Sequence, residues 1–465
     1  MKIFTLTLAA LVLAGNASPV IIRLDDAAAG TPAIRALHGT NKGPISSGGL
    51  IDLTESMREL NIPHIRLHDC HWPNPDVVDM HAVFPNPAAD PADPASYDFR
   101  LTDEYVAATR RTGARIVYRL GESIEHTTVK RHVHPPRDLE RWAQVCIGII
   151  RHYNEGWASG FEYGIEHWEI WNEPENRPVM WTGTDGDFIA LYRTASRAVK
   201  ARFPALKVGG PSFGHQGDWK DGKLTPSQFV RTFLDTCRTE SLPLDFFSWH
   251  CYSDDPGELR ARAIAVRALL DASGFPASES HLNEWNYLPG NSWRGAGKSS
   301  TPEQRRAFHD GMAGLAGAAF LAAALVELQR APVDVCNFFH GETGGFGLFT
   351  EHGLKAKPFH AMWAFSQVQK LPETLCVSEG AARDLRWVAS SSKEPRLVRV
   401  LVVHTGADPY EAALDPGRFE SWKKREMLSL KPDGSMSPER LEQNESGQLL
   451  LRGTGPQVCL VELRE

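Results

Sequence analysis

The stretch His167-Trp168-Glu169-Ile170-Trp171-Asn172-Glu173-Pro174-Glu175 is a short apolar run that ends in polar residues and a proline. Pro174 has no backbone N–H to donate to a sheet, so the run predicts a strand that stops there. Similar short runs lie on both sides of it, and segments with helical periodicity separate them. This alternation is typical of a parallel sheet covered by helices.

The β-prone runs and the helical segments alternate from about residue 33 to residue 365. Eight strands are expected, at Ala33–Gly39, Ile62–His68, Ala114–Leu120, Ile165–Asn172, Leu206–Pro211, Leu244–Cys251, Ser280–Trp285 and Val333–Phe339. Amphipathic helices are expected between them, for example at Leu101–Thr112, Leu139–Tyr153, Phe188–Arg202 and Pro302–Leu328. Asp138 and Thr301 are suitable residues to begin the second and the last of these helices.

Eight β/α units in tandem predict an α/β fold, the closed (β/α)8 or TIM barrel. An open, doubly wound sheet is the alternative. Its dinucleotide-binding form requires a GxGxxG turn after the first strand, which the sequence lacks. We therefore expect the barrel to occupy residues 18–370.

The last part of the chain has a different pattern. After about residue 370, short β-prone runs follow one another without a helical segment, at Leu385–Ala389, Leu397–His404, Met427–Leu430 and Val458–Glu462. This pattern predicts a small antiparallel β-sandwich domain over residues 371–465. Val20–Leu24, before the barrel, is a further strand that could join the sandwich.

The N-terminus resembles an export signal. Lys2 supplies a positive charge, Ile3–Ala14 is an apolar run, and small residues follow as far as Ala17. Residues 1–17 therefore predict a signal peptide and a secreted or periplasmic protein, with no membrane association after cleavage. A membrane anchor is the alternative, but the run is short for a bilayer span. The apolar segment Gly311–Val326 suits a buried helix better than a membrane span.

The composition argues against several classes of function. A formal net charge of −7 provides no basic surface, so we expect no nucleic-acid partner. The cysteines are scattered and form no CxxC pair, so we expect no disulfide framework and no zinc site. His132 and His134 form an HxH pair without an evident third ligand, which indicates a solvated loop. No metal and no organic cofactor are expected.

A second strand candidate also ends in a carboxylate, in His281-Leu282-Asn283-Glu284-Trp285-Asn286. Glu173 and Glu284 close the fourth and seventh strands, so both face the cavity at the carboxyl end of the barrel. Two carboxylates across one cavity are what glycoside hydrolysis requires, and a separation of about 5–5.5 Å gives retention of configuration. Burial beside Trp171 is expected to raise the pKa of Glu173, which then donates a proton. A salt bridge is the structural alternative for either residue alone.

The motif Trp168–Pro174 resembles the acid/base motif of clan A glycoside hydrolases. The chain is most similar to glycoside hydrolase family 39, which includes β-xylosidases and α-L-iduronidase. The resemblance covers about residues 30–370. Further similar segments are Ile65–His68, Tyr97–Phe99 with Asp103, Val208–Pro211, Phe247–Tyr252 and Lys357–Phe359.

The resemblance implies a role for each matching residue. Glu173 would be the general acid/base and Glu284 the nucleophile. Asn172 would bind the 2-hydroxyl of the sugar, and Arg66 would keep Glu284 ionised. His250 and Tyr252 would contact the sugar and the nucleophile, although a core histidine is the alternative for His250. Further predicted substrate contacts, each with a structural role as the alternative, are His68, Trp72, Glu122, Trp181, Trp293, His340 and Glu342.

Together these features predict a retaining, exo-acting β-glycosidase, similar to a β-xylosidase, that acts on oligo- or polysaccharides of plant or microbial origin. An endo-glycanase or an α-L-arabinofuranosidase of another clan A family is an alternative. A carbohydrate-binding barrel without catalysis is the alternative from another class. The loops Asp69–Tyr97, Phe213–Leu224 and Pro289–Ser300 are expected to wall the substrate pocket.

Overall fold

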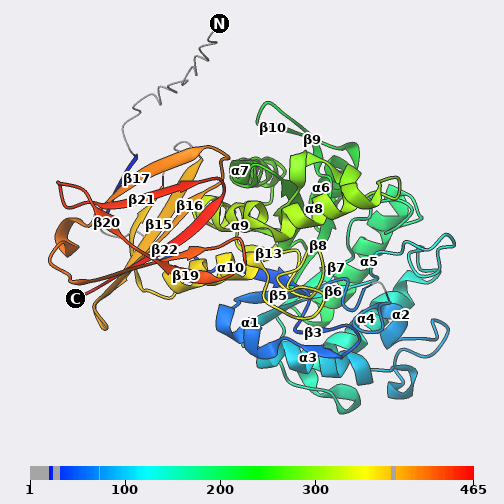
Figure 1. Ribbon diagram of the computed structural model, residues 1–465. Coiled ribbons are helices and arrows are strands. Elements are labelled where there is room, and N and C mark those ends of the chain that lie inside the picture. Colours follow the sequence, from blue (N-terminus) through cyan, green and yellow to red (C-terminus); the bar gives the residue numbers. More distant parts are fainter. Residues whose placement is uncertain (1–19, 25–31, 73, 379–383) are drawn as a thin grey trace, which may run out of the picture.

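The structure is a computed structural model that describes residues 20–24, 32–72, 74–378 and 384–465. The expected signal peptide, residues 1–17, lies outside the described residues. A helix-covered barrel lies beside a second body made of strands (Figure 1).

Eight parallel strands close into a barrel, as predicted. In spatial order they are β2 (Gly39–Asn41), β5 (His64–Leu67), β6 (Arg115–Leu120), β7 (His167–Ile170), β8 (Lys207–Phe213), β11 (Phe246–Ser253), β12 (Glu279–Tyr287) and β13 (Val335–Phe338).

The first strand is shifted from its predicted position. Residues 33–38, expected to be a strand, form no ladder, and β2 begins only at Gly39. Arg35 explains the difference, because its guanidinium donates hydrogen bonds to the backbone oxygens of Leu328, Ala331 and Val333. These contacts anchor the segment at the end of a helix, outside the barrel wall.

Helices cover the outside of the barrel. They are α1 (Thr54–Leu60), α2 (Met80–Val83), α3 (Arg100–Arg111), α4 (Leu139–Glu155), α5 (Asp185–Arg202), α6 (Gln228–Thr239), α7 (Pro256–Ala272), α8 (Pro302–Ala313), α9 (Leu315–Leu328) and α10 (Lys357–Gln369). Asp138 caps α4, and Thr301 caps α8 through a reciprocal pair with Gln304. Short 3-10 helices are η1 (Pro94–Ser96), η2 (Trp157–Ser159), η3 (Pro289–Asn291), η4 (Trp293–Gly295) and η5 (Gly417–Phe419).

The single helix predicted over Pro302–Leu328 is two helices. α8 and α9 meet at Gly314 with a bend of 43°, because Gly314 has an extended backbone with ψ −172°. α9 is the buried apolar helix expected at Gly311–Val326. Within the described residues, no single helix is long and apolar enough to cross a membrane. The bent α8–α9 pair taken together has the length and composition of a span, but α9 is buried inside the protein.

The C-terminal body is the expected antiparallel sandwich. Its six-stranded sheet has the order β14 (Glu373–Val377), β15 (Leu385–Ser392), β16 (Leu397–His404), β22 (Gln457–Arg464), β18 (Lys424–Leu430) and β19 (Met436–Glu439). The facing sheet has the order β1 (Val20–Arg23), β17 (Pro409–Asp415), β21 (Leu449–Thr454) and β20 (Glu442–Gln443). β1 pairs in parallel with β17.

The six-stranded sheet is buried on both faces. On β16, Val398, Val400 and Val402 pack against the facing sheet, whereas Leu401 and Val403 pack into the core of the barrel. This arrangement follows from the alternation of side chains along a strand. The sandwich therefore lies against α9 and α10, as Figure 1 shows.

The interior of the barrel is polar along part of its length. Residues two apart on a strand point to the same side. Three strands thereby supply a lower layer of histidines and a layer of hydrogen-bonding residues above it, consisting of His64 and Arg66, His167 and Glu169, and His281 and Asn283. Barrel interiors are usually filled by branched apolar side chains.

Candidate active site

The two predicted carboxylates lie together at the carboxyl end of the barrel. One carboxylate oxygen of Glu173 and one of Glu284 lie within 4.8 Å of each other, and a ring nitrogen of His250 lies within the same distance of both. The backbone of Glu173 has a φ of 43°, a left-handed conformation that is uncommon outside glycine, and its N–H donates to the oxygen of Ser212 (3.0 Å). Non-glycine residues in this conformation concentrate at functional sites.

Glu284 is held by donors from two other strands. Arg66 Nη1 donates to Oε1 (2.8 Å), and the Tyr252 hydroxyl donates to Oε2 (2.9 Å). His68 Nε2 lies 3.7 Å from Oε1. The Glu284 side chain is only 6% exposed. These donors fix the carboxylate from both oxygens.

Arg66 is the centre of the polar layer beneath the carboxylates. Its guanidinium also donates to Glu169 (2.6 Å), to Asn172 Oδ1 (2.7 Å) and to Ser212 Oγ (2.9 Å). Asn172 Oδ1 accepts from Ser212 as well, so its amide nitrogen remains to donate elsewhere. Asn172 therefore has the correct chemistry for a sugar hydroxyl.

His250 joins the two carboxylates. Its Nδ1 lies 2.9 Å from Glu173 Oε1 and 3.5 Å from Glu284 Oε2, and its Nε2 lies 2.6 Å from Ser212 Oγ. The second oxygen of Glu173 accepts from Asn176 Nδ2 (2.9 Å). His250 is thus a member of the site and not a core histidine bonded to backbone.

The pKa values correct one expectation. Burial alone would raise the pKa of Glu173, but hydrogen bonds from His250 and Asn176 and the charges of His250 and Arg66 bring it below its usual value. The predicted rise in the pKa of Glu173 is therefore wrong. Burial would lower the pKa of His250, but the charges of Glu284 and Glu173 raise it. One proton therefore rests mainly on the imidazole.

The pKa of Glu284 is shifted in the other direction. Burial raises it, whereas the charges of His250 and Arg66 act to lower it. Arg66 therefore lowers the pKa of Glu284, as predicted, but it offsets only part of the rise that burial causes.

The buried polar residues around Glu173 and Glu284 form hydrogen bonds and ion pairs mainly with one another. Arg119 Nε donates to His68 Nδ1 (3.2 Å). His340 Nδ1 accepts from the backbone N–H of Glu342 (3.2 Å). The remaining contacts are those of Glu342 with the Tyr105 hydroxyl (2.8 Å) and Lys42 (3.6 Å), and of Glu122 with His81 Nδ1 (2.5 Å).

The three predicted tryptophan contacts have different positions. Trp293 is 47% exposed and packs edge-on against Tyr252, with ring centroids 4.9 Å apart, so it borders the site. Trp72 is 41% exposed and packs against His126. Trp181 is fully buried between Trp171 and Phe188, and its indole N–H bonds to a backbone oxygen. The predicted sugar contact at Trp181 is wrong, because the residue belongs to the core.

The predicted wall loops contain regular structure. Residues 213–224, expected to be a loop, include most of a hairpin made of β9 (Gly217–Lys220) and β10 (Lys223–Pro226). Another small hairpin, β3 (Ile45–Ser46) with β4 (Ile51–Asp52), follows β2. His132 and His134 are exposed, and His132 stacks on His81 with ring centroids 3.8 Å apart.

Several residues of the site were not predicted. Glu169, Ser212 and Asn283 form the hydrogen-bonded layer under Glu284, together with Asn41. The signal for Glu169 and Asn283 was present, because each lies on a strand whose neighbouring inward residue is polar. Ser212 carried no such signal, since its position depends on a left-handed backbone with φ 62°.

Matches to known proteins point to the same family as the sequence motifs. The model of glycosyl hydrolases family 39 matches residues 58–273. A β-xylosidase of Geobacillus stearothermophilus is 27% identical over 264 residues, which cover 51% of this chain and 48% of that protein. A β-xylosidase of Caldicellulosiruptor saccharolyticus is 23% identical over 311 residues, covering 57% and 56%. The chain resembles glycoside hydrolase family 39. It spans about half the length of these two β-xylosidases.

A solved structure extends the likeness to nearly the whole chain. The glucosidase of Croceicoccus marinus superposes with a TM-score of 0.75 at 25% identity, covering 96% of this chain and 99% of that protein. The match to the family 39 model includes Arg66, Glu173 and His250 but ends before Glu284. The place of Glu284 in the site therefore rests on the geometry described above.

Proposed function

We propose that this protein is a retaining glycoside hydrolase that cleaves O-glycosidic bonds by double displacement. The separation of the carboxylates carries the proposal, because oxygens of Glu173 and Glu284 lie within 4.8 Å. Retaining enzymes place the two groups about 5–5.5 Å apart, whereas inverting enzymes leave about 6.5–9.5 Å for a water molecule.

The first step forms a covalent intermediate. A carboxylate oxygen of Glu284 attacks the anomeric carbon, the bond from that carbon to the leaving oxygen breaks, and Glu173 protonates the leaving oxygen. Glu173 obtains this proton through His250, whose Nδ1 lies 2.9 Å from it. Arg66 and Tyr252 hold Glu284 in place for the attack.

The second step reverses these roles. Glu173 takes a proton from water, the water oxygen bonds to the anomeric carbon, and the bond from that carbon to Glu284 breaks. Glu284 leaves as a carboxylate and again accepts from Arg66 and Tyr252. The site thereby returns to its starting protonation, with one proton on the Glu173–His250 pair.

The preferred substrate class is a β-linked sugar at a chain end, with β-xylosides first. Two of the matched relatives are β-xylosidases, and a solved structure that covers nearly the whole chain is that of a glucosidase. In this proposal Asn172 would bind the 2-hydroxyl, and the Tyr252–Trp293 pair would form an aromatic wall for a sugar face. Short oligosaccharides from plant or microbial glycans are the proposed natural substrates.

Kinetics of two variants on a panel of aryl glycosides tests this proposal. We expect turnover of an aryl β-xyloside or β-glucoside, and a near-complete loss of it in Glu173→Ala on substrates with poor leaving groups and in Glu284→Ala on all substrates. Near-wild-type turnover in both variants on the best substrate would refute the assignment.

Export to the periplasm or the medium is part of the proposal. It rests on the sequence of residues 1–17, in which a charged start precedes an apolar run and small residues. N-terminal sequencing of the protein from the cell exterior should begin near residue 18. A protein that stays in the cytoplasm with Lys2 still present would contradict it.

A further inference from the structure

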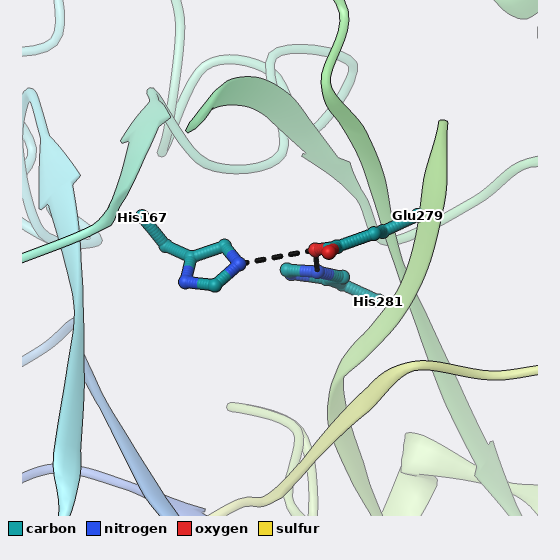
Figure 2. Close-up of side chains that lie close together, drawn as sticks. All are labelled: His167, Glu279 and His281. Carbon is teal, nitrogen blue, oxygen red and sulfur yellow. Dashed lines mark hydrogen bonds and ion pairs between the residues drawn. The ribbon is translucent and has the colours of Figure 1, made fainter. Parts of the chain in front are cut away.

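A second cluster of ionisable side chains lies at the opposite end of the barrel from Glu173 and Glu284. His167 Nε2 lies 3.0 Å from Glu279 Oε2, and His281 Nε2 lies 2.9 Å from the same oxygen. Figure 2 shows the two imidazoles meeting at this one carboxylate. The three candidate ligand atoms all lie within 4.8 Å of one another. His64, on the neighbouring part of the wall, has its ring centroid 6.4 Å from that of His167.

The cluster is separate from the catalytic site. His167 and His281 lie at the starts of β7 and β12, and the layer of Arg66, Glu169 and Asn283 lies between them and Glu284. The proposed mechanism therefore gives these histidines no role. Ordinary barrel packing does not explain them either, because this layer is normally apolar.

Lys207 completes the arrangement without blocking it. Its ammonium group lies 2.5 Å from Glu279 Oε1 and 2.9 Å from Glu166, which leaves Oε2 facing the two imidazoles. Such outer contacts orient a ligating carboxylate. The Glu279 side chain is 26% exposed, so an ion has a path from solvent at this end of the barrel.

We propose that His167, His281 and Glu279 bind a divalent transition-metal ion of the zinc class. Two histidines and one glutamate form a known zinc ligand set. Ligands about 2.1 Å from zinc at tetrahedral angles lie roughly 3.4 Å apart, so each imidazole nitrogen needs to move away from Glu279 Oε2 by only about half an ångström. The ion would tie β7 to β12 across the base of the barrel and would stabilise the fold.

Metal content and thermal unfolding test the proposal on the full chain. The protein is stripped with a chelator, incubated with a small excess of Zn²⁺ or Co²⁺, desalted and analysed for bound metal. We expect one ion per chain in the wild type, loss of that ion in Glu279→Gln and His281→Ala, and a Tm that rises with Zn²⁺ only in the wild type. Glu279→Gln retains the size of the side chain, so it guards against a folding defect in His281→Ala.

A control variant separates this site from a second candidate. Asp79, His81 and Glu122 also lie close enough together to hold an ion. His81→Ala should therefore keep the full metal content. The proposal is overturned if the wild type binds no ion after desalting, if Glu279→Gln binds as much as the wild type, or if the loss occurs in His81→Ala instead. Because the site is remote from Glu173 and Glu284, none of these results bears on the proposed hydrolase activity.

Discussion

His250 lies between two carboxylates that are proposed to need opposite protonation states. The positive charge of His250 favours the ionised forms of both Glu173 and Glu284. Leaving-group departure requires one proton on the Glu173–His250 pair, and attack requires an ionised Glu284. The pair therefore titrates as a unit, and its macroscopic pKa values belong to both residues.

Replacing His250 by asparagine should narrow the pH profile of kcat/KM from both sides. On the acid side, Glu284 loses a cation that lowers its pKa, so activity falls at higher pH than in the wild type. On the basic side, the group that loses the proton in the wild type is the His250 imidazole, whose pKa is raised from 6.5. In the variant it is the Glu173 carboxyl group, whose pKa burial raises from 4.5, so the basic limb moves to lower pH. Measuring kcat/KM over about pH 4–9 checks this prediction. Unchanged limbs would show that His250 does not share the proton.

Tyr252→Phe should weaken catalysis without unfolding the protein. The variant removes only the hydroxyl that donates to Glu284 Oε2 (2.9 Å). A hydrogen bond to a charged group contributes about 1.5–3 kcal/mol, which corresponds to roughly a 10- to 100-fold loss in kcat/KM. The acid limb should also move to higher pH, because the ionised Glu284 loses a donor. Wild-type kcat/KM in this variant would place the hydroxyl outside the reaction.

At the scale of elements, the strands were the most predictable part of the molecule. The alternation of runs predicted all eight strands, with the first displaced, and β7 ends at Ile170, two residues before the predicted end at Asn172. The sequence did not predict the shift in register between β11 and β12 at His250, which brings His250 opposite Glu284. Such a bulge depends on packing between strands and leaves no periodic signal.

Two further predictions differ from the structure because of local turns in the backbone. Helical periodicity continues across Gly314, so a single helix was predicted where the backbone turns to an extended conformation. Trp181 is predicted to contact the substrate, with a structural role as the alternative, whereas the turn after Pro174 directs it into the core. The direction of a side chain after such a turn is set by tertiary packing and leaves no periodic pattern in the sequence.

Gly39→Ala should destabilise the barrel where its first and last strands meet. A Cβ atom on Gly39 would lie 2.4 Å from the backbone oxygen of Cys336 and 2.9 Å from that of His64, so β13, β2 and β5 would have to separate. Overpacking of this kind costs about 1–3 kcal/mol. Urea unfolding of the variant measures the loss.

Gly186→Ala is the matched control, because its Cβ would meet only Thr184 Oγ1 at 3.6 Å in the first turn of α5. Helix propensity predicts a small gain of about 0.5 kcal/mol there. If both alanine variants unfold at the same urea concentration, close packing at Gly39 does not limit stability.

At the scale of the whole molecule, the sandwich is joined to the barrel by apolar packing and a buried ion pair. Residues of β15, β16, β18 and β22 belong to the same apolar core as the barrel. Arg386 on β15 lies 2.8 Å from Glu327 on α9, and both side chains are 4% exposed. The sequence predicted the two bodies from their composition, but a contact between residues 59 positions apart in different folds has no sequence signal.

Arg386→Met should destabilise the protein by about 3 kcal/mol, because it leaves the buried Glu327 with the more distant Arg260 (3.3 Å) as its ion-pair partner among the described residues. Arg452→Met removes two exposed ion pairs within the sandwich, with Glu411 and Glu442, and should cost less than about 1 kcal/mol. Chemical unfolding compares the two variants. Equal effects would show that the buried pair does not hold the bodies together.

The central claim, that two close carboxylates act by double displacement, is tested most directly by the configuration of the first product. The aryl glycoside that is cleaved fastest is hydrolysed in heavy water, and the anomeric proton is followed by NMR before mutarotation. A separation within 4.8 Å between oxygens of Glu173 and Glu284 predicts that a β-glycoside first releases the β-anomer. Initial release of the α-anomer would contradict the account, because a single displacement by water would then have taken place.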